Sequence, residues 1–326
     1  MSTPRLADAV RGGDRRALAR AITLVESTRP DHRREAVALL DALLPATGGS
    51  MRFGISGVPG AGKSTLVESL GLRAIEAGHQ VAVLAVDPSS SVSGGSILGD
   101  KTRMAELGRH PDAYIRPSPS SGALGGVARR TRESLMLCEA AGFDVVMVET
   151  VGVGQSEVAV ADLVDLFVLV ASPAGGDELQ GIKRGIMELA DVIVVNKADG
   201  DLRAAAERAA ADLRHAVHLL RPKRPGVTVE VTTCSALTGD GLAELWEALI
   251  AAHRALGPSG ISELRAGQNV AWMWNEVTDA LVSGLRHHPD VRGRLAELEA
   301  AVAGGQVTAT AAARSLLEAY LGREAD

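Results

Sequence analysis

A glycine-rich run in the first quarter of the chain ends in a lysine followed by two hydroxyl residues. It reads Gly57-Val58-Pro59-Gly60-Ala61-Gly62-Lys63-Ser64-Thr65. The run fits the phosphate-binding pattern G-x-x-x-x-G-K-[ST], whose glycines let backbone N–H groups approach a polyphosphate at the start of a helix. In this pattern the lysine, here Lys63, reaches the β- and γ-phosphates, and the hydroxyl of Ser64 binds Mg²⁺. The run therefore predicts a site for a nucleoside triphosphate and its magnesium ion.

A second motif indicates which base the nucleotide carries. The apolar run Val192–Val195 leads into Asn196-Lys197-Ala198-Asp199, which is the N-K-x-D pattern of GTPases. A carboxylate at Asp199 can accept from both N1–H and the exocyclic amine of guanine, whereas adenine lacks this donor pair. Asn196 would brace the loop, and the stem of Lys197 would lie along the base. The motif predicts that the chain binds GTP rather than ATP.

The loop after the next predicted strand is a candidate support for the base. It reads Cys234-Ser235-Ala236-Leu237 and resembles the S-A-x loop of GTPases, in which a backbone N–H supports the base. We therefore expect Ser235, Ala236 and Leu237 to belong to the nucleotide site.

A carboxylate at the end of an apolar run is a candidate to organise the magnesium ion. The run 144–148 ends in Glu149-Thr150-Val151-Gly152, an E-x-x-G sequence where small GTPases have D-x-x-G. Glu149 would face the metal through water, and the N–H of Gly152 would meet the γ-phosphate. The structural alternative is a carboxylate at a strand end followed by a turn glycine.

Two aspartates, Asp87 and Asp100, are further candidate metal ligands. Asp87 closes the apolar run 81–86, and a carboxylate at the carboxyl end of a strand beside the phosphate loop lies where Mg²⁺ and water are organised. Asp100 lies on a predicted switch. Each also has a structural interpretation, Asp87 as a turn former before Pro88 and Asp100 as a helix N-cap. The candidate metal ligands are therefore Ser64, Asp87, Asp100 and Glu149.

Short apolar runs that alternate with helical segments must position these residues. We predict strands at 52–56, 81–86, 145–149, 166–171, 192–196 and 227–232, and helices at 63–77, 126–141, 179–189, 202–220 and 242–256. Several of the runs are apolar almost throughout, as in parallel strands that are covered on both faces. The alternation predicts an α/β fold with a doubly wound, mostly parallel sheet of the P-loop GTPase kind.

Proline and glycine residues that interrupt helices divide the chain into three predicted regions. Residues 1–49 form an N-terminal helical extension that ends at Pro45 and Gly48-Gly49, and residues 50–257 form the GTPase domain. The run Gly257-Pro258-Ser259-Gly260 marks the boundary to a C-terminal helical region, 258–326. Its predicted helices are 262–286, 291–303 and 308–321. Trp272 and Trp274 lie on the first of these helices, and an aromatic pair there favours dimerisation or packing within the chain.

The composition limits the partners and the cellular compartment that we expect for the protein. The 326 residues are 46% hydrophobic and 2% aromatic, with a formal net charge of −6. Few aromatic residues and no dense basic stripe argue against a nucleic-acid partner. Cys138 and Cys234 form no C-x-x-C pair, which indicates a reducing compartment. The polar N-terminus lacks the apolar core of a signal peptide, and the apolar runs are too short to span a bilayer, so we expect a cytoplasmic protein with no membrane partner.

Taken together, these motifs resemble the G-protein chaperones of methylmalonyl-CoA mutase. This family belongs to the SIMIBI class of P-loop GTPases and was once described as arginine/ornithine transport kinases. The nine residues 149–157, E-T-V-G-V-G-Q-S-E, are the most family-specific part, and the similarity covers nearly the whole chain. The resemblance implies a homodimeric GTPase that uses GTP and Mg²⁺ and binds an adenosylcobalamin-dependent acyl-CoA mutase. It also implies that the protein gates cofactor delivery and protects or reactivates the mutase.

The resemblance further implies a switch segment, here residues 172–183. Because phosphoryl transfer needs charge stabilisation and a positioned water more than a strong base, Lys183 in this segment is a candidate cation, and Gln155 is a candidate to position the water. The structural alternative is a strand-to-helix loop with acidic residues at the helix start. We expect slow hydrolysis by the chain alone and faster hydrolysis when the mutase docks. The other candidate cations are Lys101, Arg103 and Arg184. The candidate catalytic residues are Lys63, Asp87, Glu149 and Lys183.

Three other functions fit the same fold. A metallochaperone GTPase would be expected to carry a Cys-His pair or a His-rich tail near its switches, and the chain shows neither; we interpret His287-His288 as a turn. A small-molecule kinase is disfavoured by Asp199, which selects guanine. A regulatory module that holds GTP without hydrolysing it differs from a GTPase only in its kinetics.

Overall fold

The structure, a computed structural model, describes residues 2–87, 104–119, 124–150, 156–173, 184–220, 223 and 229–322. The chain forms two compact units, Met1–Leu264 and Arg265–Asp326. Three predicted site residues, Asp100, Gly152 and Lys183, lie outside the described residues, as do Lys101, Arg103 and Gln155.

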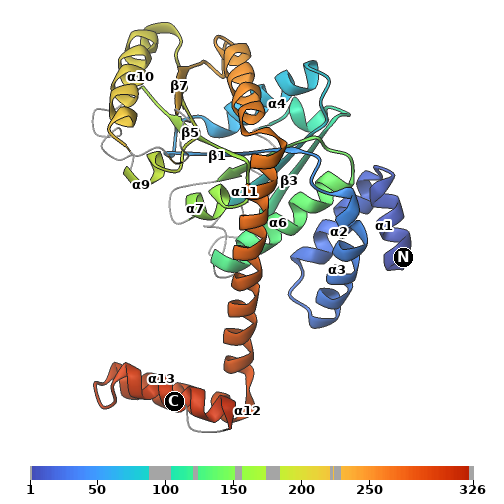
Figure 1. Cartoon of the computed structure of the whole chain (residues 1–326), viewed down its shortest axis with the longest axis vertical. Helices are drawn as coiled ribbons and strands as arrows, with labels where there is room; N and C mark the ends of the chain where they lie inside the picture. The colour runs from blue at the N-terminus through green and yellow to red at the C-terminus, as the bar shows by residue number, and fades with distance from the viewer. Residues whose placement is uncertain are drawn as a thin grey trace. The chain divides into compact units, whose positions relative to one another are not determined.

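A parallel sheet lies at the centre of the first unit (Figure 1). Its strands are β1 (Met51–Gly57), β2 (Val81–Asp87), β3 (Ala113–Pro119), β4 (Val145–Thr150), β5 (Leu166–Ala171), β6 (Val192–Val195) and β7 (Glu230–Thr233). In the described chain these seven strands lie in the order β3-β2-β4-β1-β5-β6-β7, and each neighbouring pair is parallel. The predicted doubly wound sheet is therefore confirmed. It is parallel throughout these strands.

Helices cover both faces of this sheet. In the first unit they are α1 (Thr3–Arg11), α2 (Arg15–Glu26), α3 (Pro30–Leu43), α4 (Lys63–Glu76), α6 (Leu124–Ala140), α7 (Ser156–Ala161), α9 (Arg184–Met187), α10 (Arg203–His218) and the beginning of α11 (Leu242–His287). Short 3₁₀ turns occur at Leu44–Ala46, Leu107–Arg109 and Gly200–Leu202. Side chains alternate between faces along a strand, so Val145 and Met147 of β4 pack with α4 and α11, whereas Val146 and Val148 pack with α6, α7 and α10.

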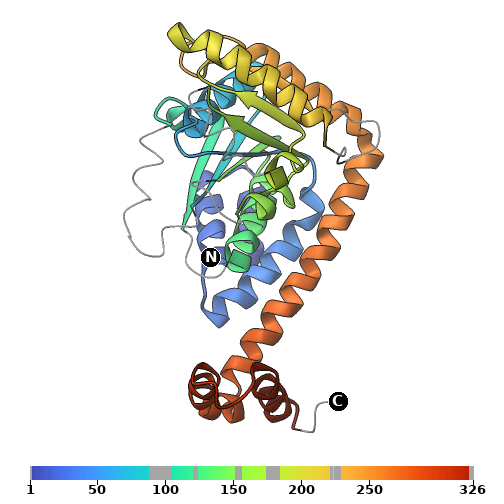
Figure 2. The same ribbon diagram turned by 90° about the vertical axis from the view of Figure 1, so that its left-hand side faces the viewer.

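The N-terminal helices α1 to α3 pack beside α6 on the second of these faces (Figures 1 and 2). Asp14 caps α2, because its carboxylate accepts from Arg16 N at 2.8 Å and from Ala17 N at 3.1 Å. Leu18 and Ile22 of α2 are buried in the same core as Leu135 of α6. The predicted N-terminal helical lead-in thus consists of three helices that extend the core of the first unit.

A buried carboxylate on α6 holds the chain that enters β1. The side chain of Glu139 is 1% exposed, and it accepts from Arg52 Nε at 2.8 Å and from Arg52 Nη2 at 2.9 Å. It also accepts from Ser50 Oγ at 2.5 Å and from Gly48 N at 2.8 Å. These bonds fix the position of β1, whose carboxyl end carries the glycine-rich run.

Replacing Glu139 with glutamine is expected to lower the free energy of unfolding by about 3 kcal/mol, because Arg52 would keep a buried charge without its partner. Urea unfolding of the full chain measures this change. Glu76→Gln is the control, since Glu76 pairs with Arg73 while 67% exposed, and exposed pairs contribute less than about 1 kcal/mol. An equal loss in both variants would contradict the assignment.

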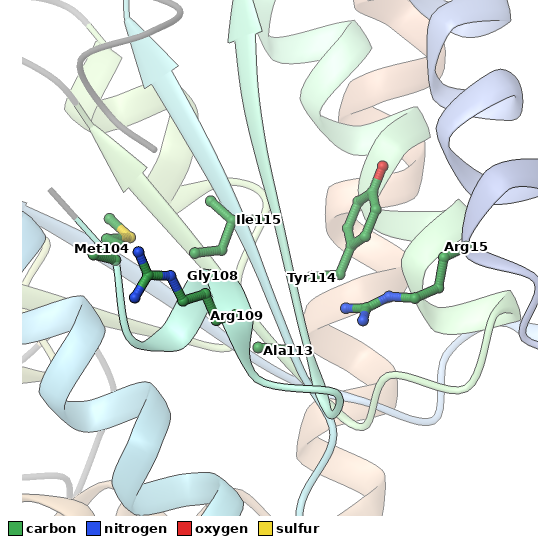
Figure 3. A pocket seen from close by; sticks show the side chains of 8 residues that line it. Arg15, Met104, Gly108, Arg109, Ala113, Tyr114 and Ile115 are labelled. Atoms are coloured by element: carbon green, nitrogen blue, oxygen red, sulfur yellow. The ribbon is translucent and has the colours of Figure 1, made fainter. Parts of the chain in front are cut away.

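The structure differs from the sequence-based prediction at the edge of the sheet. Strand β3 was not predicted, and it carries Pro117, a residue that occurs mainly in edge strands because it donates no ladder hydrogen bond. β3 indeed lies at one end of the strand order. Figure 3 shows Tyr114 and Ile115 on opposite sides of β3, and a cavity of about 460 Å³ lies at this edge. Burial raises the pKa of Tyr114 to about 12.

The C-terminal helices break where the sequence predicts. The element α11 consists of two helices that meet at Gly257, whose φ of 64° and ψ of 167° are not helical, so the break between the predicted helices 242–256 and 262–286 is confirmed. The second helix begins directly after Gly257, because Pro258 is tolerated in the first turn of a helix. None of the helices in the described ranges has both the length and the apolar character needed to span a bilayer.

The second unit contains the end of α11, α12 (Pro289–Ala303) and α13 (Ala309–Leu321). α12 packs against α13, and the ring of His288 contacts Tyr320 edge-on with centroids 5.4 Å apart. His288 is the N-cap residue of α12, so His287-His288 forms the predicted break between two helices. Trp274 on α11 is 60% exposed.

Candidate functional site

The glycine-rich run forms the turn between β1 and α4, as predicted. Gly57 ends β1 with φ 154°, and an added Cβ would lie 2.0 Å from Val170 O. Gly62 precedes α4 with φ 86°, and an added Cβ would lie 2.6 Å from Asn196 Nδ2. Only glycine fits both positions without a backbone shift. No side chain in the described chain caps α4, and the first N–H groups of a helix lack intrahelical partners, so the turn suits a phosphate group.

Lys63 lies across this turn. Its Nζ donates to Gly57 O at 2.8 Å and to Val58 O at 3.1 Å, and the residue is 7% exposed. Burial lowers the pKa of Lys63, and the nearby carboxylates of Glu149 and Glu157 act in the opposite direction. The ammonium group is thus held on two carbonyl oxygens at the mouth of the loop, where a phosphate would be a stronger partner because it is charged.

Ser64 and Glu149 meet beside Lys63. Ser64 Oγ donates to Glu149 Oε1 at 2.7 Å, and Glu149 is 2% exposed at the end of β4. A hydroxyl and a carboxylate are hard oxygen ligands of the kind that Mg²⁺ prefers, so the residues present fit the predicted metal ion. Asp87 ends the neighbouring strand β2, whose register pairs Ala85 with Glu149. The backbone therefore places Asp87 and Glu149 at the same end of the sheet.

The two predicted base-binding segments are joined through Asn196. Its Nδ2 donates to Ala61 O at 2.9 Å, and its Oδ1 accepts from Ala236 N at 3.0 Å. Asn196 therefore connects the phosphate loop to the loop that contains Ser235, Ala236 and Leu237. Lys197 has φ 64°, the only non-glycine residue with a positive φ in the described chain. This turn places Asp199 after the end of β6.

Asp199 is held by the neighbouring loop. Ser235 Oγ donates to Asp199 Oδ2, and Thr238 N donates to Ser235 Oγ at 3.1 Å. Ala198 N donates to Cys234 O at 3.0 Å. Burial raises the pKa of Cys234 to about 12, so this thiol stays neutral and packs beneath the loop. The carboxylate of Asp199 is thus oriented by its hydrogen bond to Ser235.

The predicted residues that the structure describes lie at the carboxyl ends of β1, β2, β4, β6 and β7. This is the edge at which open α/β sheets bind ligands. They come from segments far apart in the sequence, namely 57–65, 87, 149, 196–199 and the loop 235–237. The arrangement can hold a polyphosphate, a divalent cation and a guanine base side by side.

The sequence matches a known family over most of its length. The family model described as Methylmalonyl Co-A mutase-associated GTPase MeaB matches residues 18–290. The chain belongs to the MeaB family. The resemblance stated from the motifs is thereby confirmed.

Relatives of this MeaB-family chain support the assignment. A protein of Caulobacter vibrioides described as a putative GTPase is 57% identical over 309 residues, which cover 94% of each chain. The mouse protein described as methylmalonic aciduria type A homolog, mitochondrial, is 47% identical over 325 residues, covering 95% of this chain and 78% of its own. The crystal structure of a LAO/AO transport system kinase has a TM-score of 0.77 and 39% identity, with 97% and 96% of the two chains covered.

Some contacts in this MeaB-family site could not be predicted from the sequence motifs. Thr150 Oγ1 donates to Ser56 Oγ at 2.8 Å, which ties the ends of β4 and β1 together beneath the phosphate loop. Ser69 on α4 contacts the loop at Ala236. Each contact joins residues far apart in the chain, so spacing alone could not reveal them. The helix α7 after the E-x-x-G sequence was not predicted either.

Proposed function

We propose that this chain binds GTP with Mg²⁺, hydrolyses it to GDP and phosphate, and acts as a chaperone of an adenosylcobalamin-dependent acyl-CoA mutase. Methylmalonyl-CoA mutase is the client that the family name favours. The observation that carries the proposal is the Asn196 bridge, because it joins a phosphate loop to a guanine-reading loop in a MeaB-family chain. In this role the protein gates cofactor loading and protects or reactivates the mutase.

Different residues of the chain have different roles in the proposed hydrolysis. The phosphates bind at the start of α4, and Lys63 exchanges its bonds to Gly57 O and Val58 O for phosphate oxygens. Asp199 accepts from the guanine base. Ser64, Glu149 and Asp87 would hold Mg²⁺, which neutralises charge on the phosphates when it is bound. In the reaction, water attacks the γ-phosphorus, the bond to the β,γ-bridging oxygen breaks, and GDP is the leaving group.

The proposal also concerns the positively charged group that accelerates hydrolysis. Lys63 is the positively charged group that the described site supplies next to the metal ligands. We propose that docking of the mutase adds a second cation, with Lys183 as the candidate, so that the free protein turns over slowly. If Lys183→Ala kept full partner-stimulated turnover, Lys183 would be excluded from this role.

The decisive experiment is GTP turnover by the purified protein, alone and with a reconstituted adenosylcobalamin-dependent acyl-CoA mutase. ATP is the control nucleotide. We expect slow GTP hydrolysis that the mutase stimulates, with no stimulation when ATP is used. GTP binding without phosphate release in either case would indicate a module that only holds the nucleotide. Hydrolysis that methylmalonyl-CoA mutase and related mutases leave unchanged would contradict the chaperone role.

We also propose that residues 258–326 join two copies of the chain. The second unit exposes an apolar stripe on α11 formed by Val270, Met273, Trp274, Val277 and Leu281. These positions share one helix face, and a second copy offers the same stripe for a two-fold interface.

Sedimentation equilibrium is expected to give the mass of two 33.8 kDa chains. Trp274→Glu is expected to give one, because a charge would be buried in the apolar interface. The exposed, polar change Asp279→Asn is the control. A wild-type monomer at micromolar concentration would overturn the proposed dimer.

A further inference from the structure

A hydroxyl group of α4 contacts the loop that orients Asp199. Ser69 lies on α4, and its Oγ is 2.8 Å from Ala236 O and 3.0 Å from Thr65 O of its own helix. The contact to Ala236 joins residues 167 positions apart in the chain. Because α4 begins at the phosphate loop, Ser69 connects the base-reading loop to the same rigid helix that holds the phosphates.

The buried side of the loop packs against α4, because Cys234 and Ala236 belong to the same apolar core as Leu66 and Leu70. A cavity of about 470 Å³ lies between α4, the loop and the beginning of α11, and its lining includes Ser69, Leu72, Leu237 and Leu242. Leu237 is 82% exposed. On this exposed side, the hydrogen bonds of the loop therefore add to the core packing of Ala236.

Two of these hydrogen bonds fix the residue at the centre of the loop from opposite sides. Asn196 Oδ1 accepts from Ala236 N at 3.0 Å, and Ala236 O lies 2.8 Å from Ser69 Oγ. The preceding residue is Ser235, whose hydroxyl donates to Asp199. A rotation of the backbone at Ala236 would therefore displace the group that orients the base-reading carboxylate.

We propose that Ser69 is a positioning residue for guanine recognition. Its hydroxyl fixes the carbonyl of Ala236 and so keeps Ser235 against Asp199. The inference rests on the proposed binding of GTP. It adds a residue outside the N-K-x-D and S-A-x motifs to the determinants of base specificity, and it places that residue on the helix of the phosphate loop.

Ser69→Ala tests the proposal through two equilibrium affinities, for GTP and for ITP. Hypoxanthine, the base of ITP, lacks the exocyclic amine of guanine, so the ratio of the affinities reports the contact with Asp199. We expect Ser69→Ala to lower GTP affinity about fivefold, the typical effect of losing one hydrogen bond. The preference for GTP over ITP is expected to fall by a similar factor, while kcat at saturating GTP stays unchanged. Ser69→Thr keeps the hydroxyl and is expected to restore both values.

The controls separate this inference from the proposed function. Thr23→Ala removes another helix hydroxyl, which bonds Ala19 O of its own helix, and it should change neither affinity. If the wild-type protein shows no preference for GTP over ITP, the guanine site itself is wrong. If the wild type prefers GTP and Ser69→Ala keeps both the affinity and the preference, Ser69 has no positioning role. Equal losses for GTP and ITP would likewise overturn the proposal, because a general weakening of the fold acts on both nucleotides alike.

Discussion

Replacing Lys63 with methionine is expected to lower GTP turnover at saturating GTP by about a thousandfold. Phosphoryl transfer is accelerated mainly by groups that stabilise charge on the transferred phosphate, and loss of one preorganised donor costs roughly 10²- to 10³-fold. Lys63 occupies the mouth of the phosphate loop, with its ammonium on Gly57 O and Val58 O. Phosphate release measured with and without the mutase would show the loss in both conditions.

The Lys63→Met variant should remain folded. Burial lowers the pKa of Lys63, and methionine keeps most of the apolar stem without a charge to bury. Urea unfolding would check this directly. Arg314→Ala is the control, because it removes an exposed cation that pairs with Glu318 on α13 and should leave turnover unchanged. A folded Lys63→Met protein that retained more than a tenth of wild-type turnover would remove Lys63 from the catalytic residues.

The parts of the site that the sequence predicted are those in which a short motif fixes the local backbone. The glycine-rich run can turn from a strand into a helix because Gly57 and Gly62 adopt positive φ and carry no side chain that would clash there. Asn196 and Asp199 follow an apolar strand directly. In both cases the residues that determine the local backbone and the chemistry are adjacent in the sequence, so one short stretch of sequence shows the whole pattern.

The parts that were missed depend on contacts between distant residues. Thr150 and Ser56 are 94 positions apart, and a serine or threonine near a strand end is too common to indicate a pair. Strand β3 was missed because Pro117 lowers the strand propensity of its segment, while its position at the sheet edge makes the proline acceptable.

Replacing Asp199 with asparagine is expected to weaken GTP binding by about a thousandfold and to favour XTP instead. Guanine presents two donors to Asp199, whereas asparagine offers one acceptor and one donor, so an N–H of the base would face the amide N–H of the side chain. A site built for hydrogen bonding rejects a mismatched partner by large factors, because buried polar groups are left unpaired. Xanthine carries a carbonyl in place of the guanine amine and can accept from the new amide.

Competition between GTP and XTP for the purified variant measures this change. Ser235 can still donate to the oxygen of asparagine, as it does to Asp199 Oδ2, so the loop should keep its position. Asp201→Asn, on the exposed turn after the motif, is the matched control and should keep the wild-type preference for GTP. Recovery of mutase-stimulated hydrolysis with XTP would show that base recognition and phosphoryl transfer are separable in this chain. If Asp199→Asn retained wild-type GTP affinity, the N-K-x-D segment would not be the base reader.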